Sequence, residues 1–461
     1  MKKISLLLFL LPLNILLAQT QLSSVPLTLD KATDKREALT AVDSAALQMV
    51  VFAADKEKLR VLRFNRALFF TDSLSVPRPD KQYEYMAGYS FSNGNPTVYW
   101  ASSDLKKIEG LYFDIASKKV NRIPFAMPFG QREILASFSA NNTFYIVTLH
   151  AKEDRLVFYA FANGRYTSHE ADLAEAGFTS ASAKKSTFRA LLERHGLQKI
   201  DRRGFTGLEE ASSKIKIYDT PGAFVLTIDT NPAFTHVLTI DGTTFTISRR
   251  MVTQPRFTEE ADANSFYLEG NLYQIKASKE ELALTATDLS TGKAIGSHIA
   301  TAEENIAFKN TPLLSASSNR QPQQFKDTKK FLRRLYGSSL AVSVYRAPDD
   351  IRIMAGGKKN YYTAGDMFIG GVVTLSGASP DGFTNEETQI LWFESLFDDT
   401  FAHRPYTPAI LAGDRIGQFT HDIKNLHLLN IVPFRDYYVM GYYDAKLKRY
   451  VLRKFEDDYA F

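Results

Sequence analysis

Short apolar runs separated by polar turns occur along most of the chain, and they predict β-strands. In a recurring phrase, an apolar run ends in Asp or Asn, a few polar residues follow, and a second run begins. Examples are "LYFDIASKKV" around Asp114 and "VLTIDGTTFTI" around Asp241. Asn-Gly, Asp-Gly and Thr-Gly pairs between runs rich in Phe, Tyr and Val are typical of antiparallel hairpins. The pattern therefore predicts an all-β chain.

The phrase recurs about every fifty residues, once an insertion of about thirty residues is allowed for in one interval and the longest interval is taken as three units of 52. Its clear copies lie at Asn65, Asp114, Asn163, Asp241, Asp288 and Asp444, with intervals of 49, 49, 78, 47 and 156 residues. Two weaker copies, at Asp349 and near Asp398, fall inside the longest interval. Each unit also has an upstream strand, such as "QMVVFAAD" from Gln48. The recurrence therefore predicts repeated units of a few short strands each.

Two segments change to a helical pattern. Between residues 170 and 200 the sequence reads "EADLAEAG" and then "KKSTFRALLERHG", with Ser186 or Thr187 placed to cap the second helix and Gly196 placed to end it. A further helix is predicted from "DTKKFLRRLYG", near residues 325–337. Both segments are predicted to be short insertions into the repeats.

This organisation resembles that of β-propeller proteins. The phrase "DLSTGKAI", at Asp288–Ile295, is similar to the turn between the outer strands of a propeller blade. The resemblance implies seven or eight four-stranded blades over residues 47–461, with residues 19–46 as an N-terminal segment that contributes a closing strand. It is architectural and implies no particular activity, because propellers serve as enzymes, receptors and scaffolds alike.

The first eighteen residues have the pattern of a secretory signal. Lys2 and Lys3 precede the apolar run "ISLLLFLLPLNILL", and Ala18 stands where cleavage is expected. We therefore expect residues 1–18 to be a signal peptide and the mature chain to be periplasmic or secreted. No later apolar run is long enough for a transmembrane helix.

Composition narrows the chemistry. The chain has no cysteine, which excludes disulfides, thiol nucleophiles and thiolate metal sites. A formal net charge of +5 over 461 residues is mild and does not indicate a nucleic-acid partner. No cofactor motif is found, so none is expected.

Residues 392–427 form the densest polar segment, and one interpretation of it is a metal site. His403, His421 or Asp422, and His427 could bind a divalent ion through imidazole and carboxylate groups. Their spacing matches no diagnostic metal motif. The alternative, which we favour, is that these are structural residues of strands and loops.

A second interpretation of the same segment is carbohydrate chemistry. Trp392 and Arg404 would contact a sugar, while Glu394 and Asp398 or Asp399 would serve as acid and base. Glycoside hydrolysis needs two such carboxylates. Here too the alternative is a structural role.

The predicted helix near residue 330 is strongly basic. Lys329, Lys330, Arg333 and Arg334 could contact an anionic surface such as a phosphate-bearing lipid or glycan. The alternative is a solvated helix face.

The pentapeptide "VLTID" occurs twice, at Val225–Asp229 and Val237–Asp241. Two strands joined by "TNPA" should pair as a hairpin, with their C-terminal aspartates at opposite edges of the sheet. Asp229 and Asp241 should therefore share no ligand. Asp241 precedes Gly242 and is predicted to cap a turn.

These observations favour an exported cell-envelope β-propeller that acts as a non-enzymatic binding or scaffold protein for a protein or glycan partner. No compact catalytic motif is present. The alternative is a carbohydrate-active enzyme that uses carboxylates on propeller loops.

Overall fold

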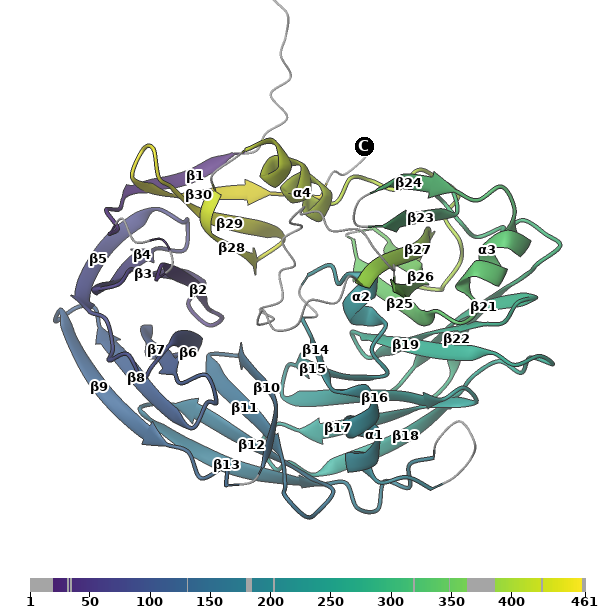
Figure 1. The fold of residues 1–461 in the computed structure, drawn as a ribbon, viewed down its shortest axis with the longest axis horizontal. Coiled ribbons are helices and arrows are strands. Elements are labelled where there is room, and N and C mark those ends of the chain that lie inside the picture. Colours follow the sequence, from purple (N-terminus) through teal and green to yellow (C-terminus); the bar gives the residue numbers. More distant parts are fainter. Residues whose placement is uncertain are drawn as a thin grey trace, which may run out of the picture. The chain divides into compact units, whose positions relative to one another are not determined.

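The computed structural model describes residues 20–457, except 31–32, 34, 131, 180–184, 202–203, 318–319, 348, 363–385 and 424–425. The predicted signal peptide lies outside these residues. Within them the prediction of an all-β fold is confirmed: strands β1–β30 form seven blade-like sheets of four or five strands, accompanied by four short helices (Figure 1). None of the described helices is long and apolar enough to cross a membrane.

The chain divides into two compact units. The first, built from the N-terminal residues to Arg78 and from Ile410–Tyr459, contains two sheets. The strands of one sheet are β2 (Glu37–Asp43), β3 (Gln48–Ala54), β4 (Lys58–Phe64) and β5 (Phe70–Pro77). Those of the other are β28 (Leu426–Phe434), β29 (Tyr437–Asp444), β30 (Arg449–Phe455) and β1 (Gln21–Pro26), and the helix α4 (Ala412–Asp422) packs on β29 and β30.

Strand β1 forms the edge of the sheet whose other three strands come from the C-terminal end of the chain. It pairs antiparallel with β30, with Ser24 opposite Val451 and Pro26 opposite Arg449. The guanidinium of Arg449 donates to Oγ of Ser24 at 2.6 Å and to its carbonyl at 2.5 Å. Segments from the two ends of the chain thus complete one sheet.

The second unit, mainly Pro79–Ala409, contains five sheets. The first two consist of β6 (Tyr85–Ser92), β7 (Asn95–Ala101), β8 (Lys107–Asp114) and β9 (Lys119–Ala126), and of β10 (Glu133–Ala140), β11 (Thr143–Leu149), β12 (Arg155–Ala162) and β13 (Arg165–Asp172). The third consists of β14 (Gln198–Ile200), β15 (Ile215–Thr220), β16 (Ala223–Asn231), β17 (Phe234–Asp241) and β18 (Ile247–Thr253). The fourth consists of β19 (Asp262–Leu268), β20 (Asn271–Ala277), β21 (Glu281–Asp288) and β22 (Ala294–Thr301).

The fifth sheet of this unit departs from simple repetition. Its order is β24-β23-β27-β26-β25, from β25 (Ser339–Arg346), β26 (Ile351–Tyr362), β27 (Glu386–Phe397), β23 (Leu314–Ser317) and β24 (Arg320–Gln324). Its outer hairpin, β23–β24, therefore precedes the inner strands in the sequence. This inversion explains why the repeat phrase weakens after Asp288.

The recurring Asp and Asn residues mostly occupy one kind of turn. Five of them lie between the penultimate and the outer strand of a sheet, at Asn65, Asp114, Asn163, Asp241 and Asp288. Asp349 lies between β25 and β26, and Asp444 between β29 and β30, so these two copies mark other turns.

The turn at Asp288 shows how these residues act. Its carboxylate accepts hydrogen bonds from Ser290 and Thr291, and these bonds lower its pKa to about 2. At another of these turns, Asn163 and Gly164 both have positive φ, as a tight hairpin turn requires.

Four helices interrupt the strands. The helix α1 (Phe188–His195) begins after Thr187, whose side chain accepts from the Ala190 amide, and ends at Gly196.

The segment "EADLAEAG", predicted to be helical, instead completes β13 and enters a turn, because its alanines and acids continue the β12–β13 hairpin. The helix α3 (Thr328–Leu335) lies in the predicted place. The helices α2 (Leu208–Ala211) and α4 were not predicted.

Candidate functional site

The carboxylate of Glu394, a predicted acid or base, is engaged in a buried ion pair. The guanidinium of Arg352 on β26 reaches its Oε2 atom from β27, with Nη2 at 2.5 Å and Nε at 2.8 Å. Arg352 also donates to the Ala409 carbonyl at 2.7 Å. These two contacts to one carboxylate oxygen join neighbouring strands and hold Oε2 in charged hydrogen bonds with the guanidinium.

The carboxylates of Asp398 and Asp399 are also engaged in hydrogen bonds or ion pairs. Asp398 accepts from the amides of Thr400 and Ala402, at 2.9 and 3.0 Å, and its pKa is lowered mainly by the hydroxyl of Thr400. Arg404 lies 3.5 Å from it. Asp399 is exposed and pairs with Arg346. These residues hold the turn after β27.

Trp392 and His403 pack as structural residues. Trp392 is half-buried on β27 against the main apolar cluster of the second unit. Nε2 of His403 lies 3.0 Å from the Asn310 side-chain oxygen, and burial lowers the pKa of His403.

The remaining metal candidates belong to the first unit. His421 and Asp422 are exposed at the end of α4, and His427 is half-buried on β28. Across the described parts of the chain, no group of three His, Asp or Glu side chains is placed to hold a metal ion.

The basic residues of α3 are largely paired. Lys329 lies 2.5 Å from Glu303, Lys330 lies 3.4 Å from Asp327, and Arg334 donates to Gln389 at 3.1 Å. Arg333 is exposed. Contact of this helix with an anionic surface stays a prediction.

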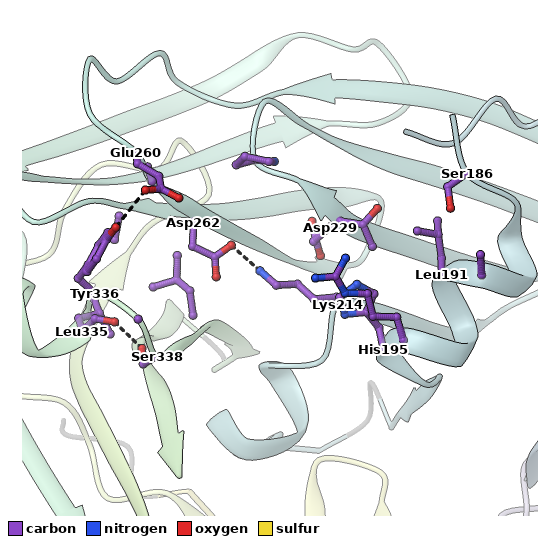
Figure 2. A pocket seen from close by; sticks show the side chains of 18 residues that line it. Ser186, Leu191, His195, Lys214, Asp229, Glu260, Asp262, Leu335, Tyr336 and Ser338 are labelled. Atoms are coloured by element: carbon purple, nitrogen blue, oxygen red, sulfur yellow. Dashed lines mark hydrogen bonds and ion pairs between the residues drawn. The ribbon is translucent and has the colours of Figure 1, made fainter. Parts of the chain in front are cut away.

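A pocket of about 710 Å³ lies in the second unit (Figure 2). Its walls come from α1, from Lys214 directly before β15, from the end of β16, from the loop before β19, from the end of β20 and from the segment joining α3 to β25. Ligand pockets usually have volumes of ~300–1,000 Å³. Both predicted helical insertions therefore contribute to one cavity, together with strand residues of three sheets.

Asp154 fixes the position of α1. Its carboxylate accepts from the amides of Phe188 and Arg189, at 2.9 and 3.1 Å. These are orphan donors of the first helical turn, which capping by a carboxylate stabilises. Phe188, Leu191 and Leu192 are buried beneath the helix. Ala190 and Arg194 are exposed and line the pocket, and the buried Leu191 also contributes to its wall.

Asp229, the last residue of the first "VLTID", lies at the pocket wall and is 3% exposed. Its Oδ2 atom is 3.1 Å from Nζ of Lys216 and accepts from the Ser265 hydroxyl at 2.9 Å. Its Oδ1 atom accepts from the Thr235 hydroxyl at 2.7 Å. Asp241, in contrast, is exposed and accepts from the amides of Thr243 and Thr244, as expected for a turn cap.

Other charged groups of the pocket also pair across it. Nζ of Lys214 lies 2.7 Å from Oδ1 of Asp262 and donates to the Ala263 carbonyl at 2.7 Å. The Tyr336 hydroxyl donates to Oε2 of Glu260 at 3.2 Å. This bond is the main cause of the raised pKa of Tyr336. Figure 2 shows the Glu260–Tyr336 pair at one end and His195 towards the other.

His195 closes the α1 end of the pocket. Burial lowers its pKa, and the positive charges of Arg194 and Lys214 lower it further. At neutral pH the ring is therefore uncharged, and it can donate or accept a hydrogen bond.

Few features of the sequence indicate this pocket. Its residues come from six separate segments, and none forms a compact motif. Among them only Asp229 had been considered, through the repeated pentapeptide. The two helical insertions were the usable signal, since insertions into repeated sheets are where binding surfaces are commonly built.

No protein-family model and no curated protein matches the chain. Among solved structures, a mutant of the apocarotenoid oxygenase of Synechocystis aligns with a TM-score of 0.30 and 9% identity, covering 59% of this chain and 63% of that one. A protein from Lactobacillus plantarum aligns at 0.27 and 12%, covering 68% and 79%. An uncharacterized protein from Listeria monocytogenes aligns at 0.26 and 11%, covering 60% and 69%. The chain thus spans less than two thirds of the oxygenase, and likeness at this level carries no functional argument.

Proposed function

We propose that this chain is an exported binding protein of the cell envelope and that it holds a small polar ligand in the pocket between α1 and α3. The support for export comes from the sequence, in which two lysines precede an apolar run at the N-terminus. The support for binding comes from the pocket.

The observation that carries the proposal is a cavity of about 710 Å³ in which most titratable groups are already paired with one another. Asp229 pairs with Lys216, Asp262 with Lys214, and Glu260 with Tyr336. A general base needs a free lone pair directed at the substrate. Outside His195, the titratable groups of the pocket therefore favour recognition by hydrogen bonding over proton transfer.

The alternative of a carbohydrate-active enzyme has less support. Its predicted carboxylates, Glu394, Asp398 and Asp399, are held in an ion pair, a turn cap and a surface pair, respectively. They lie outside the set of residues that line the pocket.

The test is native mass spectrometry of the purified chain after incubation with an envelope extract. We expect an adduct of low mass that is absent from the Ala190→Trp variant, because Ala190 is exposed on the pocket wall and indole would fill the space. Ala445→Trp, at an exposed turn outside the pocket, is the matched control and should retain the adduct. An adduct that persists in the Ala190→Trp variant would place binding elsewhere and contradict the proposal.

A further inference from the structure

After the internal pairs are formed, two opposite charges remain at the pocket. Within the part of the chain that the structure describes, Arg194 takes part in no hydrogen bond or ion pair. Glu260 accepts one hydrogen bond, through Oε2, and its Oε1 atom has no partner among the described residues. Both side chains belong to exposed residues that line the cavity.

These two charges lie on different walls. Arg194 is in the last turn of α1, directly before His195, whereas Glu260 lies in the loop before β19, beside Tyr336. Figure 2 shows Glu260 and His195 separated by the Lys214–Asp262 pair. Nζ of Lys279 lies 4.5 Å from the centroid of the Tyr336 ring, but Lys279 does not line the pocket. The pocket is therefore polarised, acidic at one end and basic at the other.

Apart from the Lys214–Asp262 pair, which lies between the two ends, the rest of the lining consists mainly of small or apolar side chains. Leu191 projects from α1, Leu335 from α3, and Pro232 and Ala277 from the ends of β-strand segments. A ligand that fits would carry an ammonium group at one end, a carboxylate at the other, and small apolar groups between them.

We propose, on the basis of the binding function argued above, that the ligand is a short peptide with free termini and small apolar side chains. Its ammonium group would lie against Glu260 and Tyr336 and its carboxylate against Arg194. A peptide extends by ~3.3–3.6 Å per residue, so a peptide of two to four residues is ~7–14 Å long.

The experiment is calorimetric titration of the whole mature chain with four probes: tri-alanine, N-acetyl-tri-alanine, tri-alanine amide and a neutral trisaccharide. We expect tri-alanine to bind and each blocked peptide to bind at least about fivefold more weakly, which corresponds to the ~1 kcal/mol of a good exposed ion pair. Equal affinity for free and blocked peptides would overturn the inference.

Two substitutions assign the ends. Glu260→Gln should weaken the binding of tri-alanine about fivefold but leave the binding of the N-acetylated peptide unchanged. Arg194→Gln should weaken the binding of tri-alanine about fivefold but leave the binding of tri-alanine amide unchanged. The matched controls are Glu259→Gln, next to Glu260 but outside the pocket lining, and Arg333→Gln, an exposed cation on α3. A loss that is equal for free and blocked peptides would contradict the assignment.

The two proposals fail separately. Absence of tri-alanine binding overturns the peptide inference whatever the envelope extract yields. The chain could instead bind the trisaccharide and not tri-alanine, with the Ala190→Trp substitution abolishing that binding. The pocket would then remain a binding site, and its ligand would be a glycan instead of a peptide. An envelope adduct that persists in the Ala190→Trp variant contradicts the binding function proposed for the pocket, whereas the titration with tri-alanine decides the peptide inference.

Discussion

Nζ of Lys216 lies 3.1 Å from Oδ2 of Asp229, and both side chains are almost completely buried, at 0% and 1% exposure. The ammonium group also donates to the Asn264 side-chain oxygen and to the Ser213 carbonyl, both at 2.6 Å. Asn264 in turn donates to the Leu340 carbonyl at 2.6 Å. One buried ion pair therefore links β15 and β16 to β19 and to the start of β25.

Replacing the buried lysine should destabilise the second unit strongly. Lys216→Met leaves the Asp229 carboxylate in the interior without its cation, and removing one partner of a buried pair costs about 3–5 kcal/mol. The measurement is urea denaturation followed by circular dichroism.

Lys214→Met is the matched control for this experiment. Lys214 pairs with Asp262, whose side chain is 47% exposed, so its loss should cost about 1 kcal/mol or less. Equal unfolding midpoints for the two variants would contradict the structural role given to Lys216.

Asp55 should make the first unit sensitive to acid. Burial raises the pKa of its carboxyl, but hydrogen bonds from the Lys58 and Glu57 amides and from Arg60 outweigh burial and lower it to about 2 from 3.8. A lowered pKa gives stability that is fully present above pH 3.8 and is lost as the pH falls through about 2. The amount is about 2 kcal/mol.

The measurement is the difference in unfolding free energy between the natural chain and Asp55→Asn as a function of pH. This difference should be largest above pH 5 and should shrink between about pH 4 and pH 2. A difference that does not change over this range would show that the charge of Asp55 contributes no stability.

The two copies of "VLTID" show what the sequence could and could not predict. The hairpin, the turn cap at Asp241 and the separation of the two aspartates follow from local periodicity and turn chemistry, and the structure has all three. The burial of Asp229 follows from Lys216, thirteen residues earlier, and from Ser265 on another sheet. Such a contact depends on how sheets pack, and a local pattern carries no information about it.

The same reasoning applies to the other misjudged elements. The helix α4 was missed because "AGDRIGQFTHD" contains two glycines, and it is held by the packing of Ile416 and Phe419 on β29 and β30. Glu394 was considered as an acid or base because it stands near Trp392 in the polar segment 392–427. Its partner, Arg352, is forty-two residues away and could be identified only through the pairing of β26 and β27.

The pairing of β1 with β30 should be needed for order in the last sheet. Val25 is 5% exposed and belongs to an apolar cluster with Met49, Tyr450 and Leu452. Val25→Asp would place an unpaired carboxylate among these side chains, at a cost of about 3 kcal/mol or more.

Hydrogen exchange of the β30 amides is the measurement, because the loss of an edge strand is a local opening that global unfolding can miss. We expect protection of β30 to fall in Val25→Asp and to be unchanged in Gln21→Asp, which alters an exposed position on the same strand. Unchanged protection in both variants would mean that β1 is not required for the order of β30.

His236 should limit stability in mild acid. The ring is 4% exposed on β17, its Nε2 atom has no hydrogen-bond partner among the described residues, and Phe178 and Phe234 pack on it with ring centroids 5.4 and 5.0 Å away. Burial lowers its pKa below 6.5, and the nearby Asp229 offsets only part of this effect.

Below pH 6.5 the unfolded chain therefore binds a proton that the folded chain does not, and stability is lost as the pH falls towards the lowered pKa. Each unit by which the pKa is lowered contributes about 1.4 kcal/mol to this loss.

His236→Phe removes the titrating group and keeps an aromatic ring of similar size. We expect the variant to match or slightly exceed the natural chain in thermal stability at pH 7.5 and to exceed it by a larger margin at pH 5. If the margin is the same at both values, the buried ring does not titrate as described, and its cost must come from packing or from the unpaired nitrogen alone.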